Sequence, residues 1–163
     1  DSDTVITRSR ELNTMMYAVA NRMSQAMVCG LVVQEFEQPQ AQRHLFSEVD
    51  ITDTPDNQPA KVRVQVNLLI EQIWGNALTD LSTEQNQAYA LFEELWRSRI
   101  ESAPNDYLYY NNSNETNDDN DEYCRLDWDN EDNGALVRDP NHTLRAWMAL
   151  MSYLLSDFTV LYE

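Results

Sequence analysis

The strongest constraint on the fold is the recurrence of apolar residues at steps of three and four in four separate segments. This spacing puts apolar side chains on one face of an α-helix. In the first segment they are Leu12, Met15, Met16, Val19, Met23, Met27 and Leu31. They predict a helix over residues 4–37, which Pro39 stops. We expect this methionine-rich stripe to pack into a core, with a partner-binding face as the alternative.

A second and a third helix follow from the same spacing. The second is predicted over residues 60–78, and its apolar face consists of Val62, Val66, Leu69, Ile70, Ile73, Trp74 and Ala77. The third opens at a capping box formed by Ser82 and Gln85 and ends near Ala103. Its predicted buried face is Tyr89, Phe92, Leu95, Trp96 and Ile100. Between the first two helices, turn-forming residues around a short apolar cluster predict an ordered connector over residues 39–59.

The fourth helix is predicted to start after the sequence Asp139-Pro140-Asn141, with Asn141 or Thr143 as its cap. Its apolar face is Leu144, Trp147, Met148, Met151, Leu154, Leu155, Phe158 and Leu161. Amphipathic helices bury their apolar faces most simply against one another. With 163 residues, 42% of them apolar, we expect an all-α, four-helix-bundle-like single domain over residues 1–163. A long acidic Asn/Asp-rich loop over residues 104–140 separates its third and fourth helices.

The chain is strongly acidic, with 28 Asp and Glu residues against 11 Lys and Arg and a net charge of −17. Such a charge repels phosphate backbones and anionic membranes, so nucleic acid and membranes are disfavoured as partners. No continuous apolar run approaches the ~20 residues of a membrane span. We therefore expect a soluble protein.

Part of the acidic loop has the order of oxygen-bearing residues found in calcium loops. Asp129, Glu131 and Asn133 stand at the first, third and fifth positions, followed by Gly134. The twelfth position, a bidentate Glu in an EF-hand, is Pro140. The candidate ligands for a weakly bound calcium ion are Asp127, Asp129, Glu131, Asn133 and Asp139. The alternative is a solvated acidic loop whose alternation reflects composition alone.

The two cysteines, Cys29 and Cys124, fit neither a redox motif nor a zinc-binding spacing. In an oxidising compartment we expect them to form a disulfide, which would tie the acidic loop to the first helix. Two unpaired thiols are the alternative. The first residue is Asp1, which is consistent with a removed signal peptide or with a trimmed sequence.

The search for catalytic motifs is mostly negative. The sequence contains no nucleotide-binding motif and no C-x-x-C-H haem motif, and neither His44 nor His142 has a partner at zinc-ligand spacing. Glu93-Glu94 and the pair Glu35/Glu37 are candidates for a carboxylate-based hydrolase, but residues one or two apart on a helix do not face each other. We expect a protein without catalytic activity and keep the hydrolase as an alternative.

The stretch DPNHTLRAWMALMSYLLSDFTVLYE resembles the closing helix of large exported bacterial cytochrome-associated proteins. The resemblance lies in the alternation of Trp, Leu and Ser-Asp before a final Phe, Leu and Tyr, and covers about 25 residues. It implies export. Haem is not carried over, because the binding motif is missing.

Together these features predict a periplasmic or extracellular interaction module, or a subunit of a larger assembly, with a protein partner. Aromatic residues with polar groups are frequent interface anchors. The candidates in the acidic loop are Tyr107, Tyr109, Tyr110, Tyr123 and Trp128. The remaining alternative is an acidic inhibitor that mimics nucleic acid and occupies a basic groove. Such a protein spreads its acids along helix faces, whereas here they concentrate in one loop.

Overall fold

The computed structural model describes residues 14–75, 81–102, 136 and 139–156. The elements are α1 (Thr14–Glu37), the short 3-10 helix η1 (Gln40–Gln42), α2 (Pro59–Trp74), α3 (Leu81–Ser102) and α5 (Thr143–Ser156). No strand occurs within these ranges, so the predicted all-α class is confirmed. Most of the predicted acidic loop, residues 104–140, lies outside them. None of the described helices has the length and apolar character needed to cross a membrane.

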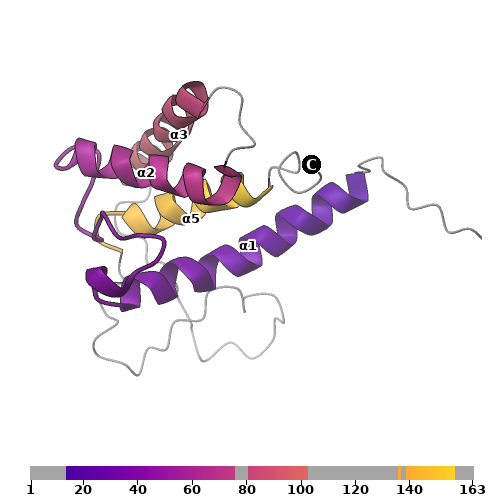
Figure 1. Ribbon diagram of the computed structural model, residues 1–163, viewed down its shortest axis with the longest axis horizontal. Coiled ribbons are helices and arrows are strands. Elements are labelled where there is room, and N and C mark those ends of the chain that lie inside the picture. The colour runs from indigo at the N-terminus through magenta and orange to yellow at the C-terminus, as the bar shows by residue number, and fades with distance from the viewer. Residues whose placement is uncertain (1–13, 76–80, 103–135, 137–138, 157–163) are drawn as a thin grey trace, which may run out of the picture.

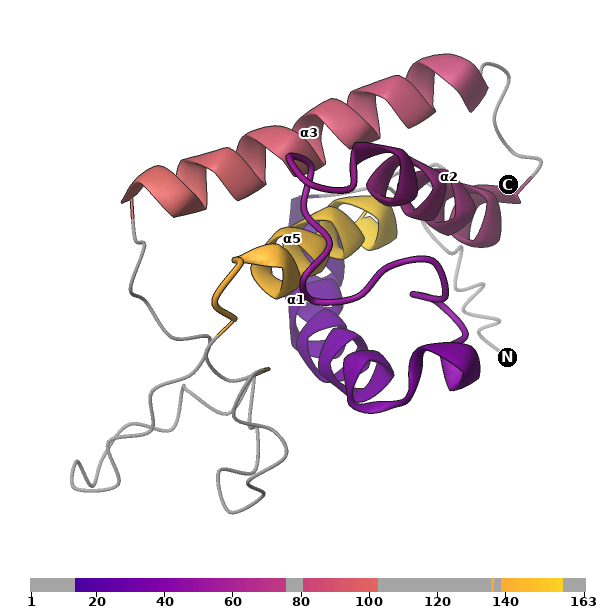
Figure 2. The ribbon, with the colours of Figure 1, turned by 90° about the vertical axis from the view of Figure 1, so that its left-hand side faces the viewer.

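Helix α5 is the centre of the fold. It lies between α1 on one side and α2 with α3 on the other (Figures 1 and 2), and it packs against all three. The apolar residues of α5 that are fully buried are Leu144, Ala146, Trp147, Leu150, Met151 and Leu154. They recur at steps of three and four, so the predicted apolar face of this helix is confirmed over the described residues.

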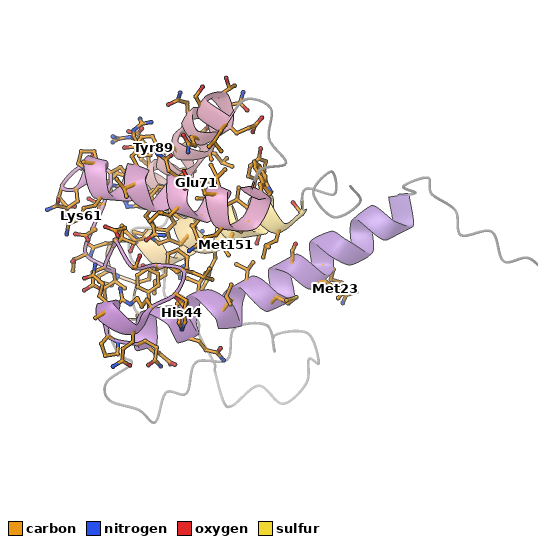
Figure 3. All side chains as sticks on the ribbon, in the orientation of Figure 1. Met23, His44, Lys61, Glu71, Tyr89 and Met151 are labelled. Carbon is orange, nitrogen blue, oxygen red and sulfur yellow. The ribbon has the colours of Figure 1, made fainter. Side chains whose placement is uncertain are left out.

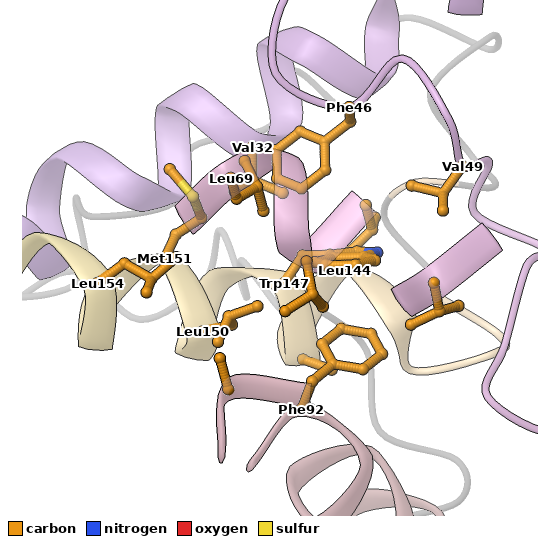
Figure 4. Packing of buried hydrophobic residues seen from close by; sticks show 14 of the residues in the cluster. Val32, Phe46, Val49, Leu69, Phe92, Leu144, Trp147, Leu150, Met151 and Leu154 are labelled. Carbon is orange, nitrogen blue, oxygen red and sulfur yellow. The ribbon is translucent and has the colours of Figure 1, made fainter. Parts of the chain in front are cut away.

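Trp147 occupies the middle of the core, between two phenylalanines from different parts of the chain (Figure 4). Its ring centroid lies 4.1 Å from that of Phe92 in α3. It lies 5.4 Å from that of Phe46 in the connector, in an edge-to-face arrangement. Phe46 in turn contacts Phe36 of α1, with 5.0 Å between centroids. One aromatic chain therefore joins α1, the connector, α5 and α3.

The connector between α1 and α2 is ordered, as predicted, and polar side chains of the flanking helices bind its backbone. Gln65 of α2 is fully buried, donates a hydrogen bond to the carbonyl of Leu45 and accepts one from the amide of Glu48 at 3.0 Å. The Glu35 carboxylate of α1 accepts hydrogen bonds from the amides of Leu45 at 2.7 Å and Phe46 at 3.3 Å. Because these bonds satisfy buried backbone groups, a segment without regular structure can enter the core.

The prediction for the core face of α1 was wrong at two methionines, whereas its Leu31 packs against the core. Met23 and Met27 were expected to be buried, but their side chains are 58% and 64% exposed. The buried positions are instead Val28, Val32 and Phe36, which recur at steps of four. Helix α1 thus has two apolar faces, and α5 packs against the one with β-branched and aromatic residues.

Helix boundaries also differ from the prediction in places. Helix α2 ends at Trp74 instead of continuing to residue 78, because Gly75 adopts a positive φ of 55° and its amide closes the last turn on the Glu71 carbonyl. Helix α3 is already helical at Leu81, one residue before the predicted capping box, and its predicted core residue Ile100 is exposed.

Two valines of α2 test the assignment of the core. Val62 is fully buried and Val64 is 46% exposed, so the same substitution removes the same atoms from two environments. Val62→Ala should lower the free energy of unfolding by about 2 kcal/mol, from lost burial and a residual cavity. Val64→Ala should leave it within about 0.5 kcal/mol, because alanine also favours the helix. Urea unfolding followed by circular dichroism measures both, and equal losses would contradict this packing.

Candidate functional site

Polar residues that are almost completely buried gather at the start of α5. Asp139, His142 and Thr143 are 1%, 4% and 0% exposed. Burying polar groups is costly unless they form hydrogen bonds, so such a cluster identifies a specific structural or functional arrangement.

The turn that precedes α5 brings the Asp139 side chain back onto the helix. The amide of His142 donates to the carbonyl of Asp139 at 2.9 Å, with Pro140 at the second turn position, where proline is favoured. The Asp139 carboxylate then accepts hydrogen bonds from the amides of Leu144 at 3.1 Å and Arg145 at 3.2 Å, one to each oxygen. Asp139 therefore caps α5.

The predicted caps, Asn141 and Thr143, have a different role. The Thr143 hydroxyl donates to the carbonyl of Ile51 at 2.7 Å, and the Asn141 side-chain amide donates to the same oxygen at 3.3 Å. The indole of Trp96 in α3 donates to the carbonyl of Asn141 at 2.7 Å. We refer to Ile51, Trp96, Asp139, Asn141 and Thr143 as the α5 junction. It joins the connector, α3 and α5.

Two residues of this turn adopt unusual backbone angles, and one of them carries a buried carboxyl group. Asp139 and His142 have positive φ angles of 39° and 55°, which side-chain-bearing residues rarely adopt. Burial raises the pKa of the Asp139 carboxyl, although the amides of Leu144 and Arg145 and the charge of Arg145 act in the opposite direction. The ring atom Nδ1 of His142 has no hydrogen-bond partner in the described structure.

The junction is better suited to holding segments together than to catalysis. Both oxygens of its carboxylate accept backbone amides, so neither is directed at an open site. One carboxylate of each pair considered for a hydrolase is also engaged. Glu93 forms an ion pair with Arg97 at 2.9 Å, and Glu35 binds connector amides.

The structure describes one of the five predicted calcium ligands, Asp139, which is the cap of α5. The other four, Asp127, Asp129, Glu131 and Asn133, lie outside the described residues. Within the described ranges, no group of three or more His, Cys, Asp or Glu side chains is arranged to hold a metal ion. Calcium binding stays a prediction.

The predicted disulfide and interaction residues fall largely outside the described ranges. Cys29 is buried on α1, whereas Cys124 is not described. The five aromatic candidates, Tyr107, Tyr109, Tyr110, Tyr123 and Trp128, are not described either. Both predictions therefore stay untested.

The outer side of α1 is the surface that the predicted core assignment missed. We call Met23 and Met27 the methionine face. Figure 3 shows Met23 on the side of α1 turned away from α2 and α5. The signal for this orientation was present in the sequence as the competing series Val28, Val32 and Phe36. Large apolar side chains exposed together on a helix are typical of interaction surfaces.

Comparison of the chain with protein-family models, with curated proteins and with solved structures finds no match in any of the three. The resemblance of residues 139–163 to exported cytochrome-associated proteins therefore stays an expectation from the sequence. Function is inferred from the described geometry.

The raised pKa of Asp139 predicts a specific dependence of stability on pH. A carboxyl whose pKa is higher in the folded than in the unfolded state contributes stability below the unfolded value of about 3.9. That contribution is lost as pH rises through the folded pKa. Asparagine does not titrate, so the wild-type protein should lose stability relative to Asp139→Asn as pH increases from about 4.

Urea unfolding of both proteins at a series of pH values measures this difference. Glu101→Gln, at an exposed side chain near the end of α3, corrects for the general effect of removing one negative charge. The difference in free energy of unfolding between wild type and Asp139→Asn should change with pH. A constant difference, or a change in the opposite direction, would contradict the raised pKa of the buried carboxyl.

Proposed function

We propose that this protein is a non-catalytic helical interaction module, or a subunit of a larger assembly, acting in the periplasm or outside the cell. The observation that carries the proposal is the methionine face, where Met23 and Met27 are exposed while the opposite face of the same helix builds the core. Methionine is flexible and polarizable, which suits adaptable contact with another protein.

The roles of the polar residues support a module without catalytic activity. Asp139, Glu35 and Gln65 bind backbone groups within the fold instead of lining an open site. The net charge of −17 disfavours nucleic acid and anionic membranes as partners and so favours a protein.

We extend the proposal to the whole chain. Residues 1–163 form one bundle-like domain, with the acidic segment 104–140 as an excursion between α3 and α5. The aromatic residues of that segment provide a second set of partner contacts. They are Tyr107, Tyr109, Tyr110, Tyr123 and Trp128.

Site-directed crosslinking tests the interaction role. A photoreactive amino acid replaces Met27, and the matched control places it at Val64, which is also exposed but lies on α2. Irradiation in an extract of the source cells should give a defined crosslinked product from position 27 and little from position 64, with the partner identified by mass spectrometry. Failure of position 27 to crosslink, or equal nonspecific products from both positions, would refute an interaction role for this face.

Two accessory features complete the proposal. A disulfide between Cys29 and Cys124 would close a long loop, and by the chain-entropy model such a bridge stabilises by on the order of 4 kcal/mol. Calcium would be held by Asp127, Asp129, Glu131 and Asn133. Asp139 could join them only by giving up its bonds to the amides of Leu144 and Arg145. Hard oxygen ligands and flexible geometry suit this ion.

Thermal melting with and without a reductant, and with and without calcium, tests both features in one design. Reductant should lower the melting temperature if the bridge is present. Millimolar calcium should raise it more than magnesium does, because the ion binds only the folded state and magnesium demands tighter geometry. Replacing Asp129 and Glu131 by Asn and Gln should remove the calcium effect. A melting temperature that reductant leaves unchanged would refute the disulfide, and one that calcium leaves unchanged would refute the calcium site.

A further inference from the structure

The methionines whose side chains the structure describes have opposite surroundings on α1 and on α5. Met23 and Met27 of α1 are 58% and 64% exposed, and their spacing of four puts both side chains on one face of the helix, one turn apart. Met151 of α5 is 1% exposed and lies among the packed side chains of the core (Figure 4), and Met148 is half-buried against that core. Small reagents in solution therefore reach the side chains of Met23 and Met27 but not that of Met151.

A thioether exposed in this way reacts with hydroperoxides. With hydrogen peroxide, the sulfur lone pair attacks one oxygen, so an S–O bond forms while the O–O bond breaks. The sulfur loses two electrons and the peroxide gains them, and the departing hydroxide takes the proton of the transferred oxygen and leaves as water. The product is methionine sulfoxide, which is polar where the thioether was apolar. Reductases convert it back to methionine, so the modification is reversible.

The chemistry of the reagent and of the chain favours this pair as the reactive site. A thioether has no ionisable proton, so its reactivity does not require deprotonation, as that of a thiol does. Hydrogen peroxide is uncharged near neutral pH, so the net charge of −17 does not repel it as it repels anionic oxidants. Cys29, on the same helix, is only 4% exposed, so a reagent in solution meets the two methionines first.

Oxidation at Met23 and Met27 leaves the core untouched. Helix α1 packs through Val28, Val32 and Phe36, and neither exposed methionine belongs to the core cluster or packs against it. An oxygen added to either one is solvated and displaces no core atom. The same oxygen on Met151 would enter a packed apolar interior, where a polar atom without a hydrogen-bond partner is costly.

We propose that Met23 and Met27 form a reversible oxidation site for hydroperoxides, which converts the methionine face from apolar to polar without unfolding the protein. Because the two side chains are neighbours on the helix, sulfoxides at both positions change the same patch of surface. The site goes beyond the proposed interaction role and does not depend on it, since the reaction requires only that the two side chains are exposed.

Oxidation of the purified full chain with dilute hydrogen peroxide tests the site. Trypsin cuts after Arg22 and Arg43, so Met23 and Met27 share one peptide, and mass spectrometry measures oxygen uptake at each methionine. In the folded protein, both should oxidise at least about tenfold faster than Met151, which reacts only when the core opens. In urea the three rates should agree within about threefold, since burial no longer distinguishes the side chains.

Two variants remove sulfur atoms while keeping the side chains apolar and helix-forming. Met23→Leu with Met27→Leu removes the exposed pair, and Met151→Leu removes the fully buried sulfur as the matched control. The first variant should lower the fast oxygen uptake of the folded protein by the two atoms that the pair accepts. The second should leave that fast uptake unchanged. Circular dichroism verifies that each variant is folded.

The effect on stability separates this site from oxidation of the core. Peroxide treatment should lower the melting temperature of the wild type by no more than about 2 °C beyond the change in Met23→Leu with Met27→Leu, because both sulfoxides are solvated. Methionine sulfoxide reductases for both epimers should then restore the original mass of the peptide.

Equal oxidation rates of Met23, Met27 and Met151 in the folded protein would overturn the site. A larger fall in the melting temperature of the wild type than of the leucine variant would contradict a modification that leaves the fold intact. Sulfoxides that the reductases do not remove from the folded protein would overturn the reversibility.

Discussion

The contact on which the fold depends is the packing of Trp147 between Phe46 and Phe92. These three rings come from α5, the connector and α3, and Phe36 of α1 extends the cluster. Aromatic pairs in offset or edge-to-face geometry contribute about 0.5–1.5 kcal/mol each beyond their buried area. Because α2 packs onto the same core, the four described α-helices meet at this cluster or beside it. The connector is part of the core for the same reason: without Phe46, one side of Trp147 would have no aromatic neighbour.

Polar groups determine where the aromatic core stops. At one end the α5 junction binds the Ile51 carbonyl, and at another the indole of Trp74 donates to the carbonyl of Leu154 at 3.0 Å. Side-chain donors thus satisfy backbone carbonyls of the connector and of the last turn of α5, which have no partner within a helix. The turn before α5 holds its positive φ angles because such bonds surround it. The acidic character of the chain is therefore compatible with a packed core: Gln65, Asp139 and Thr143 bind backbone groups, and most charged side chains of the described residues are exposed or half-buried.

Helical periodicity predicted the all-α class and the apolar faces of α2 and α5 with few errors, and turn-forming residues predicted the ordered connector. Periodicity failed on α1, because it identifies every apolar face of a helix but does not say which one a neighbour will cover. That choice depended on Phe46 and α5, which are distant in sequence. The cap of α5 was missed for a related reason. Asp139 stands too far before the helix for the usual capping pattern, and only the positive φ of the intervening turn brings its carboxylate back. Most predicted site residues lie in the acidic segment, outside the described residues, so those predictions stay untested.

The position of α5 in the chain has a consequence for how the protein folds during synthesis. The ribosome releases α1, the connector, α2 and α3 before the helix around which all three others pack. Thr143 and Ile51, which share a hydrogen bond, are separated by 92 positions. Contacts between such distant residues form late and slow the folding of a domain. Until α5 emerges, the apolar faces of the earlier helices have no common partner and are open to chaperones or to aggregation. The helix made last among those described is thus the one that closes the core.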